Sequence, residues 1–93
     1  MKHFIIVKFN DEVDKEKIKE PIRDLFSKAL KIDGIKNVDI YNSNSDLANR
    51  HDMMIEMNLS EEAMDMFDKS EIHREWKEKY GECIINKTIF DCD

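Results

Sequence analysis

The segment "IKNVDIYNSNSDLANRHDMMIEMNL" (35–59) decides the fold, because it holds two strands in succession with no helix between them. Residues 35–42 alternate between two sets of side chains, Ile35, Asn37, Asp39 and Tyr41 against Lys36, Val38 and Ile40. This alternation predicts a strand with one wet face. Residues 52–59 place four apolar side chains on one face, Met53, Ile55, Met57 and Leu59. The polar stretch between the two strands predicts a loop.

A strand and a helix precede this pair. "KHFIIVKF" (2–9) is β-branched and aromatic with two mostly apolar faces, which predicts a strand covered on both sides. Asp14 is a suitable N-cap for a helix. The apolar residues that follow recur at helical spacing, at Ile18, Ile22, Leu25, Phe26, Ala29 and Leu30. Pro21 predicts a kink or a delayed start, and Gly34 suits a left-handed helix end.

A second helix and a last strand follow the pair. Ser60 is a suitable N-cap, and the two acids after it favour a helix start. The apolar side chains expected to be buried are Ala63, Met64, Phe67, Ile72 and Trp76. Gly81 predicts the end of the helical region, and "ECIINKTIF" (82–90) predicts the last strand.

The element order predicts the fold class. Strand, helix, strand, strand, helix, strand is the ferredoxin-like α+β order βαββαβ, with a four-stranded antiparallel sheet and helices over one face. We expect residues 1–93 to form a single domain. The opposite face would carry five apolar side chains, Phe4, Ile6, Met54, Ile84 and Phe90, together with Glu56 and Asn86. Since no segment is left to cover it, we expect a homodimer through this sheet face.

Charge and cysteine content exclude several classes of function. The 93 residues carry a net charge of −6, and lysines alternate with acids, so we expect no nucleic-acid partner. No segment reaches membrane-spanning length, and no membrane partner is expected. Cys83 and Cys92 have neither a zinc spacing nor a disulfide pattern, which favours a reduced, cytoplasmic protein. The three histidines show no metal-ligand spacing, so we expect no metal and no other cofactor.

His73, in "SEIHREW" (70–76), is the main candidate for chemistry. One interpretation makes it a general base at a helix start, where the helix dipole disfavours the imidazolium. The other makes Ser70 the N-cap and binds the ring of His73 back to the backbone, as in a capping box. His3 is expected on the helix-covered face, where it could line a cavity. His51 is expected to be exposed, and Asp52 to be an acid bonded to backbone or to a neighbouring side chain.

The chain resembles the stress-responsive A/B-barrel (Dabb) domains of the dimeric α+β barrel superfamily. The segments that carry the resemblance are "KHFIIVKFNDEV", "DGIKNVDIY", "RHDMMIEM", "MFDKSEIHREW" and "IINKTIFD". They cover nearly the whole chain, although none is as specific as a metal-binding signature. Membership implies a homodimer that forms a barrel, and it implies no particular activity.

A more distant resemblance is to the olivetolic acid cyclase branch of this family. These plant enzymes close a linear polyketide by an aldol-type condensation without a metal or organic cofactor, using a histidine base and a tyrosine partner. The resemblance places His73 on the catalytic histidine and His3 on a pocket histidine. The catalytic tyrosine falls on Phe67, which cannot hydrogen bond, and a second pocket tyrosine falls on Leu25.

We therefore expect first a small, cytoplasmic, non-enzymatic homodimer of the Dabb type. It would bind a small apolar or amphipathic ligand in the cleft between helices and sheet, or act as a stress-linked accessory protein. The alternative is a cofactor-free cyclase, lyase or monooxygenase in which His73 is the base and His3 a polarising group. The predicted ligand-binding side chains are Ile5, Val7, Leu25, Met53, Ile55, Phe67 and Trp76. A closely packed core would use the same residues at the same positions.

Overall fold

One antiparallel sheet and three helices make up the protein, in the computed structural model that describes residues 1–93. The strands are β1 (Lys2–Phe9), β2 (Ile35–Asn42), β3 (Met53–Leu59) and β4 (Ile84–Cys92). The α-helices are α1 (Lys15–Ser27), α2 (Glu61–Asp68) and α3 (Glu71–Tyr80), and two 3₁₀ turns, η1 (Lys28–Lys31) and η2 (Gly81–Cys83), follow α1 and α3. The strand order is β2-β3-β1-β4 with every neighbouring pair antiparallel. This confirms the ferredoxin-like α+β prediction.

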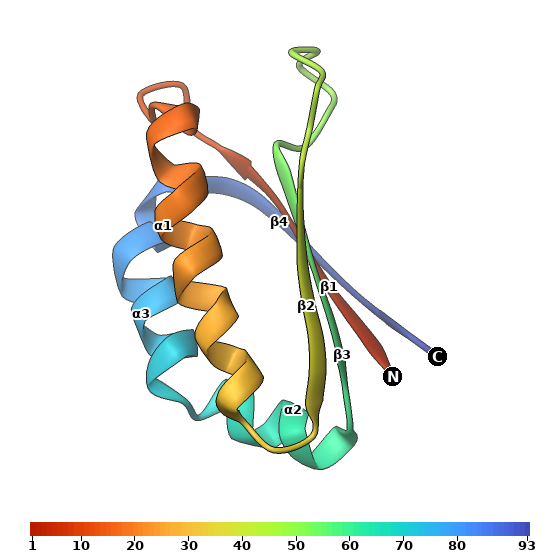
Figure 1. The fold of residues 1–93 in the computed structure, drawn as a ribbon. Helices are drawn as coiled ribbons and strands as arrows, with labels where there is room; N and C mark the ends of the chain where they lie inside the picture. Colours follow the sequence, from red (N-terminus) through yellow and green to blue (C-terminus); the bar gives the residue numbers. More distant parts are fainter.

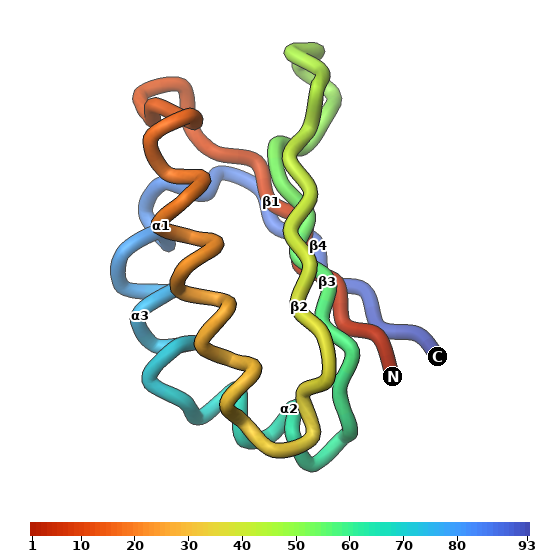
Figure 2. Tube along the Cα trace, in the orientation of Figure 1, coloured from red at the N-terminus to blue at the C-terminus, as the bar shows by residue number.

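The helices lie on one side of the sheet. Figure 1 shows α1 and α3 side by side over one face and α2 at one end, below the strands. The tube in Figure 2 shows β2 and β3 running together into a long arm, formed by the loop 43–52, beyond the rest of the molecule. No helix is both long enough and apolar enough to cross a membrane.

Caps fix the helix starts. The Asp14 side chain accepts hydrogen bonds from the backbone N–H groups of Glu16 and Lys17, which confirms it as the N-cap. Helix α1 therefore begins at Lys15 and continues through Pro21, so the delayed start predicted at the proline is wrong. The α-helix ends at Ser27, and the tighter turn of η1 leaves Leu30 48% exposed rather than in the apolar stripe.

The second helical region is divided in two, at the polar break before Ser70. The Oγ of Ser60 accepts from the N–H of Ala63 at 3.1 Å, and the Oγ of Ser70 accepts from the N–H of His73 at 3.2 Å. Both serines are thus N-caps. Before β2, Gly34 has φ +95°, as predicted, and an added Cβ there would lie 2.7 Å from the Oγ of Ser60. This glycine is required both for its backbone conformation and for its close approach to α2.

The core lies between the helices and the sheet. Fifteen apolar side chains are buried there: Ile5, Val7, Phe9, Ile22, Leu25, Phe26, Ala29, Ile35, Met53, Ile55, Met57, Leu59, Ala63, Phe67 and Trp76. The odd-numbered residues of β1 and β3 face the helices because side chains alternate along a strand.

Two register shifts change the faces that simple alternation predicts. In β4, Asn86 pairs with Lys8 but Ile84 pairs with Phe9, so one extra residue is inserted at Ile85. This places Ile84 against the core, and its prediction on the opposite face is wrong. In β2, a similar shift between Ile35 and Asn37 buries Ile35, although alternation groups it with exposed residues.

The face of the sheet opposite the helices, called the open face below, carries Phe4, Ile6, Met54 and Phe90. In the register, Phe4 lies opposite Phe90 and Ile6 lies opposite Met54, and Phe90 is 58% exposed. At one side, the Tyr41 hydroxyl donates to Glu56 at 3.4 Å. No element of this chain covers the open face (Figure 1).

Candidate functional site

A cleft of about 300 Å³ opens between β1, β4, α2 and α3, and it contains both candidate histidines. We call it the histidine cleft. Its lining residues are His3, Ile5, Met64, Asp68, His73, Trp76, Lys87, Ile89 and Asp91. The volume is at the lower end of the range for small-molecule sites, roughly 300–1,000 Å³.

His3 and Asp91 form a close pair at one end of the cleft. The Nδ1 of His3 lies 2.5 Å from the Oδ1 of Asp91, across the antiparallel pairing of β1 and β4. The histidine side chain is 10% exposed and the aspartate 48%. Because a carboxylate only accepts hydrogen bonds, Nδ1 carries the proton in this contact. The pair fixes the orientation of the His3 ring on the helix-covered face, where it was predicted.

His73 is held from two sides at the start of α3. Its backbone N–H donates to Ser70, and its Nδ1 lies 3.1 Å from the carbonyl oxygen of Asp68. The predicted bond from ring to backbone is therefore present, although the ring donates to a carbonyl instead of accepting from the N-cap. In the neutral ring this leaves Nε2 unprotonated and free to accept.

The environment of His73 favours its neutral form. Burial lowers the pKa of His73 below its ordinary value near 6.5, and the ammonium groups of Lys77 and Lys87 lower it further, against an opposing effect of Asp68. A neutral imidazole with a free Nε2 at pH 7 is the form that a general base requires.

Buried aromatic rings pack against His73 and Trp76. The ring of Phe67 lies 5.3 Å from the His73 ring between centroids. Trp76 meets Phe26 edge to face at 5.0 Å. Phe67 and Phe26 are fully buried, so His73 and Trp76 pack against the aromatic core of the protein.

The structure distributes the predicted ligand-binding residues over several places. Ile5 and Trp76 line the histidine cleft, and Met53 lines a different pocket beside Asp52. All seven predicted residues belong to the buried core, and four of them line neither pocket: Val7, Leu25, Ile55 and Phe67.

Five residues of the cleft were not among the predicted site residues: Met64, Asp68, Lys87, Ile89 and Asp91. The sequence did contain a signal for Asp91. The first and last strands pair antiparallel in this fold, so the start of β1 and the end of β4 must meet, and Asp91 lies opposite His3.

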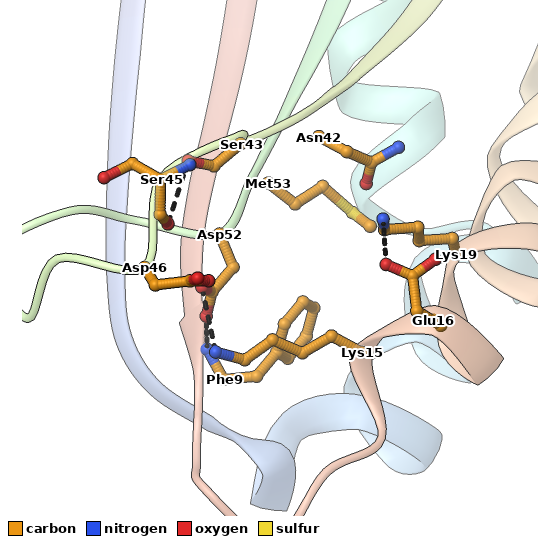
Figure 3. A pocket seen from close by; sticks show the side chains of 10 residues that line it. All are labelled: Phe9, Lys15, Glu16, Lys19, Asn42, Ser43, Ser45, Asp46, Asp52 and Met53. Atoms are coloured by element: carbon orange, nitrogen blue, oxygen red, sulfur yellow. Dashed lines mark hydrogen bonds and ion pairs between the residues drawn. The ribbon is translucent and has the colours of Figure 1, made fainter.

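A second, polar pocket lies near the ends of β1 and β2 and the start of α1 (Figure 3). Here the Oδ2 of Asp52 accepts from the Phe9 N–H at 2.8 Å, and its Oδ1 lies 3.2 Å from the Nζ of Lys15. This confirms the expected bonding of Asp52. Lys19 pairs with Glu16 at 2.7 Å, so both lysines of this pocket are paired with acids.

His51 is not the exposed residue that was predicted. It is half-buried beside Ile6, Tyr41 and Met54, and its Nε2 is buried without a hydrogen-bond partner. The cause is the return of the loop onto β3, which lays the ring against the edge of the open face. No group of three or more His, Cys, Asp or Glu side chains is arranged to hold a metal ion.

Known structures share this fold. A dimeric ferredoxin-like protein of unknown function from Thermobifida fusca aligns with a TM-score of 0.80 at 18% identity, covering 96% of this chain and 85% of that chain. An Arabidopsis thaliana protein aligns at 0.79 and 21% identity, covering 99% and 92%. A candidate antibiotic biosynthesis monooxygenase from Bacteroides thetaiotaomicron aligns at 0.79 and 12% identity, covering 100% and 87%.

No protein-family model matches the chain, and no curated protein matches it at a significant level. At these identities the structural neighbours show the fold alone.

Proposed function

We propose that this protein is a homodimeric small-molecule-binding domain of the stress-responsive A/B-barrel type, with its ligand in the histidine cleft. The observation that carries the proposal is the convergence of His3 from β1 with His73 and Trp76 from α3 on one open cleft. Small-molecule sites combine apolar surface with convergent polar groups. In this cleft four apolar residues, Ile5, Met64, Trp76 and Ile89, lie among five polar or charged ones.

The homodimer is the second part of the proposal. The open face supports it, because an uncovered sheet face with Phe4, Ile6, Met54 and Phe90 is apolar enough to need a partner. A second copy of the chain closes the two sheets into the dimeric barrel. The description of the Thermobifida fusca neighbour as dimeric agrees with this assembly.

Binding in the cleft is tested with 1-octanol, a neutral amphipathic probe. Trp76 is the single tryptophan of the chain and lines the cleft, so its emission reports on occupancy directly. We expect a saturable change in emission and a higher melting temperature, since a ligand that binds the native state stabilises it.

The matched variants are Ile89→Lys and Ile85→Lys. Both isoleucines are on β4 and well exposed, at 46% and 60%, but only Ile89 lines the histidine cleft. Ile89→Lys should abolish the response, and Ile85→Lys should keep it. A response that is identical in the two variants, or absent from the wild type, contradicts the proposal.

A second candidate function is a cofactor-free reaction in which the Nε2 of His73 is the general base. The bond from Nδ1 to the Asp68 carbonyl favours it, because it leaves Nε2 free. The resemblance to polyketide cyclases and the description of the Bacteroides neighbour supply two reaction classes, cyclisation and mono-oxygenation.

The enzyme hypothesis is tested by turnover of β-dicarbonyl compounds and polycyclic phenols with the wild type and His73→Gln. Activity that is present in the wild type and lost in the variant supports it. Comparison in air and under argon then separates the classes, because only the monooxygenase consumes dioxygen. Absence of turnover in the wild type leaves the binding function.

A further inference from the structure

The charges around the histidine cleft differ in balance from those of the whole chain, whose net charge is −6. The cleft and the hollow beside it, at the start of α3, are lined by four Lys or Arg and three Asp or Glu. These are Lys69, Arg74, Lys77, Lys87, Asp68, Glu71 and Asp91. The small positive excess comes from the hollow, because the lining of the cleft itself holds one cation, Lys87, and two carboxylates, Asp68 and Asp91.

Ion pairs and hydrogen bonds occupy several of these charged groups. Asp91 is bonded to His3, and Glu71 is paired with Arg74. The charged groups of this region without an ion-pair partner are then three ammonium groups and one carboxylate, those of Lys69, Lys77, Lys87 and Asp68. Of the three ammonium groups, only that of Lys87 lines the cleft itself.

The three cleft residues of β4 form a graded row. Lys87, Ile89 and Asp91 alternate along the strand on its helix-covered face, so the row runs from a cation through an apolar side chain to the His3–Asp91 pair. Four residues of extended strand span about 13 Å. Ile89 remains 46% exposed in the middle of the row, with Ile5 opposite it on β1.

We propose that the ligand of the histidine cleft is an amphipathic carboxylic acid, whose carboxylate binds the ammonium group of Lys87 and whose hydrocarbon part lies on Ile89 and Trp76. This inference rests on the proposed binding function and specifies its ligand class. Lys87 is the residue that selects an acid over a neutral compound of the same shape. A carboxylate forms a charge-assisted hydrogen bond that offsets the desolvation of the ammonium group, and a neutral group does not.

The proposal has a consequence for His73. The charge of Lys87 is one of the causes that keep the His73 ring neutral. A carboxylate bound to Lys87 offsets that charge and adds a negative one nearby, so binding of the acid shifts the His73 titration upward. A neutral ligand at the same place brings no such charge.

The experiment compares octanoate with 1-octanol as probes of equal chain length. Binding is followed by the indole N–H signal of Trp76, and the His73 ring is titrated by NMR in each complex. The variant is Lys87→Met, which keeps the length of the side chain and removes the charge. The control is Lys36→Met, an exposed lysine on the far edge strand β2.

We expect the wild type to bind octanoate about fivefold more tightly than 1-octanol, as a partly exposed ion pair would give. Lys87→Met should make the two affinities equal, and Lys36→Met should change neither. The His73 titration should move upward with octanoate alone.

Two results overturn the inference in different ways. Equal affinity of the wild type for both probes, unchanged in Lys87→Met, overturns the acid selectivity and leaves the binding function standing. Failure of both probes to bind overturns the binding function, and the inference with it.

Discussion

His73 is the residue on which the proposed cofactor-free reaction depends. Its position follows from three local facts: Ser70 caps α3, the third helical residue turns back toward the cap, and the Asp68 carbonyl is within reach of Nδ1. The same contacts that build the helix start therefore aim Nε2 away from the backbone. A structural role and a binding role are compatible for this side chain.

The first prediction concerns the protonation of His73. Its pKa should lie below 6.5, because burial and the two lysines disfavour the imidazolium. Below that pH the unfolded chain binds more protons than the folded one, so the free energy of unfolding rises with pH through this window. This contribution to stability is present above pH 6.5 and is lost as the pH falls.

The measurement is an NMR titration of the His73 ring together with urea unfolding between pH 5.5 and 7.5. The variant His73→Gln should show a flatter dependence of unfolding free energy on pH. A His73 midpoint above 6.5 in the free protein contradicts the account.

The second prediction concerns the His3–Asp91 pair. Asp91→Ala leaves the nearly buried Nδ1 of His3 without an acceptor, which should cost about 1–2 kcal/mol of unfolding free energy. Asp91→Asn retains an acceptor oxygen and should cost less. Urea unfolding of the two variants checks this. Equal losses of unfolding free energy would contradict the prediction, because they would show that the acceptor oxygen retained in Asp91→Asn adds no stability.

At the scale of elements, the sequence predicted the order and type of the strands because alternation and helical spacing are strong in this chain. Asp14 marked the start of α1 correctly, and of the two alternatives that Pro21 predicted, a kink or a delayed start, the delayed start is wrong. The sequence misplaced Ile84 and Ile35 because a bulge inserts one residue and reverses every face beyond it. Nothing in "GECIIN" marks the position of that insertion.

The histidine cleft was harder to predict than the fold. His3, His73, Ile5 and Trp76 were expected to face the region between helices and sheet, and they line the cleft. The alternation that places Phe90 on the open face turns Lys87 and Asp91 to the helix-covered face, but which residues of β4 lie opposite His3 depends on the register, and a shift of one residue would change them.

The third prediction concerns the cap of α3. Ser70→Ala should lower the unfolding free energy by about 1 kcal/mol, the usual value of a serine N-cap. It should also weaken binding in the cleft, because the cap holds the turn that positions His73. Ser27→Ala is the control, since the Ser27 hydroxyl donates to the Asp24 carbonyl and caps no helix start.

Urea unfolding and the Trp76 emission assay are both needed here. A loss of stability in Ser70→Ala without any change in binding would show that the N-cap is not needed to position His73 for binding. Equal effects of Ser70→Ala and Ser27→Ala would show that neither hydroxyl has a special role.

On the scale of the whole molecule, the two faces of the sheet differ in what covers them. One face packs against the helices and forms the cleft at its edge. The other presents Phe4, Ile6 and Met54 with no cover, and the half-buried His51 lies beside it. A small domain with one covered face has a limited core, so the proposed association of two copies would add stability as well as close the barrel.

The fourth prediction is therefore a dimer of twice 11.1 kDa in light scattering at micromolar concentration. Ile6→Lys places a charge in the middle of the open face and should give a monomer. Met66→Lys is the control, because Met66 is 57% exposed on α2, away from that face. A wild-type monomer, or a dimer in Ile6→Lys, contradicts the assembly.

Binding of a small amphipathic molecule in the histidine cleft is the function proposed for this protein. The most direct measurement is a map of NMR chemical-shift changes in the labelled protein on titration with 1-octanol. The account predicts saturable changes concentrated at His3, His73, Trp76 and Ile89. Changes concentrated instead at Phe4, Ile6 and Phe90 on the open face, or no saturable changes at all, would contradict it.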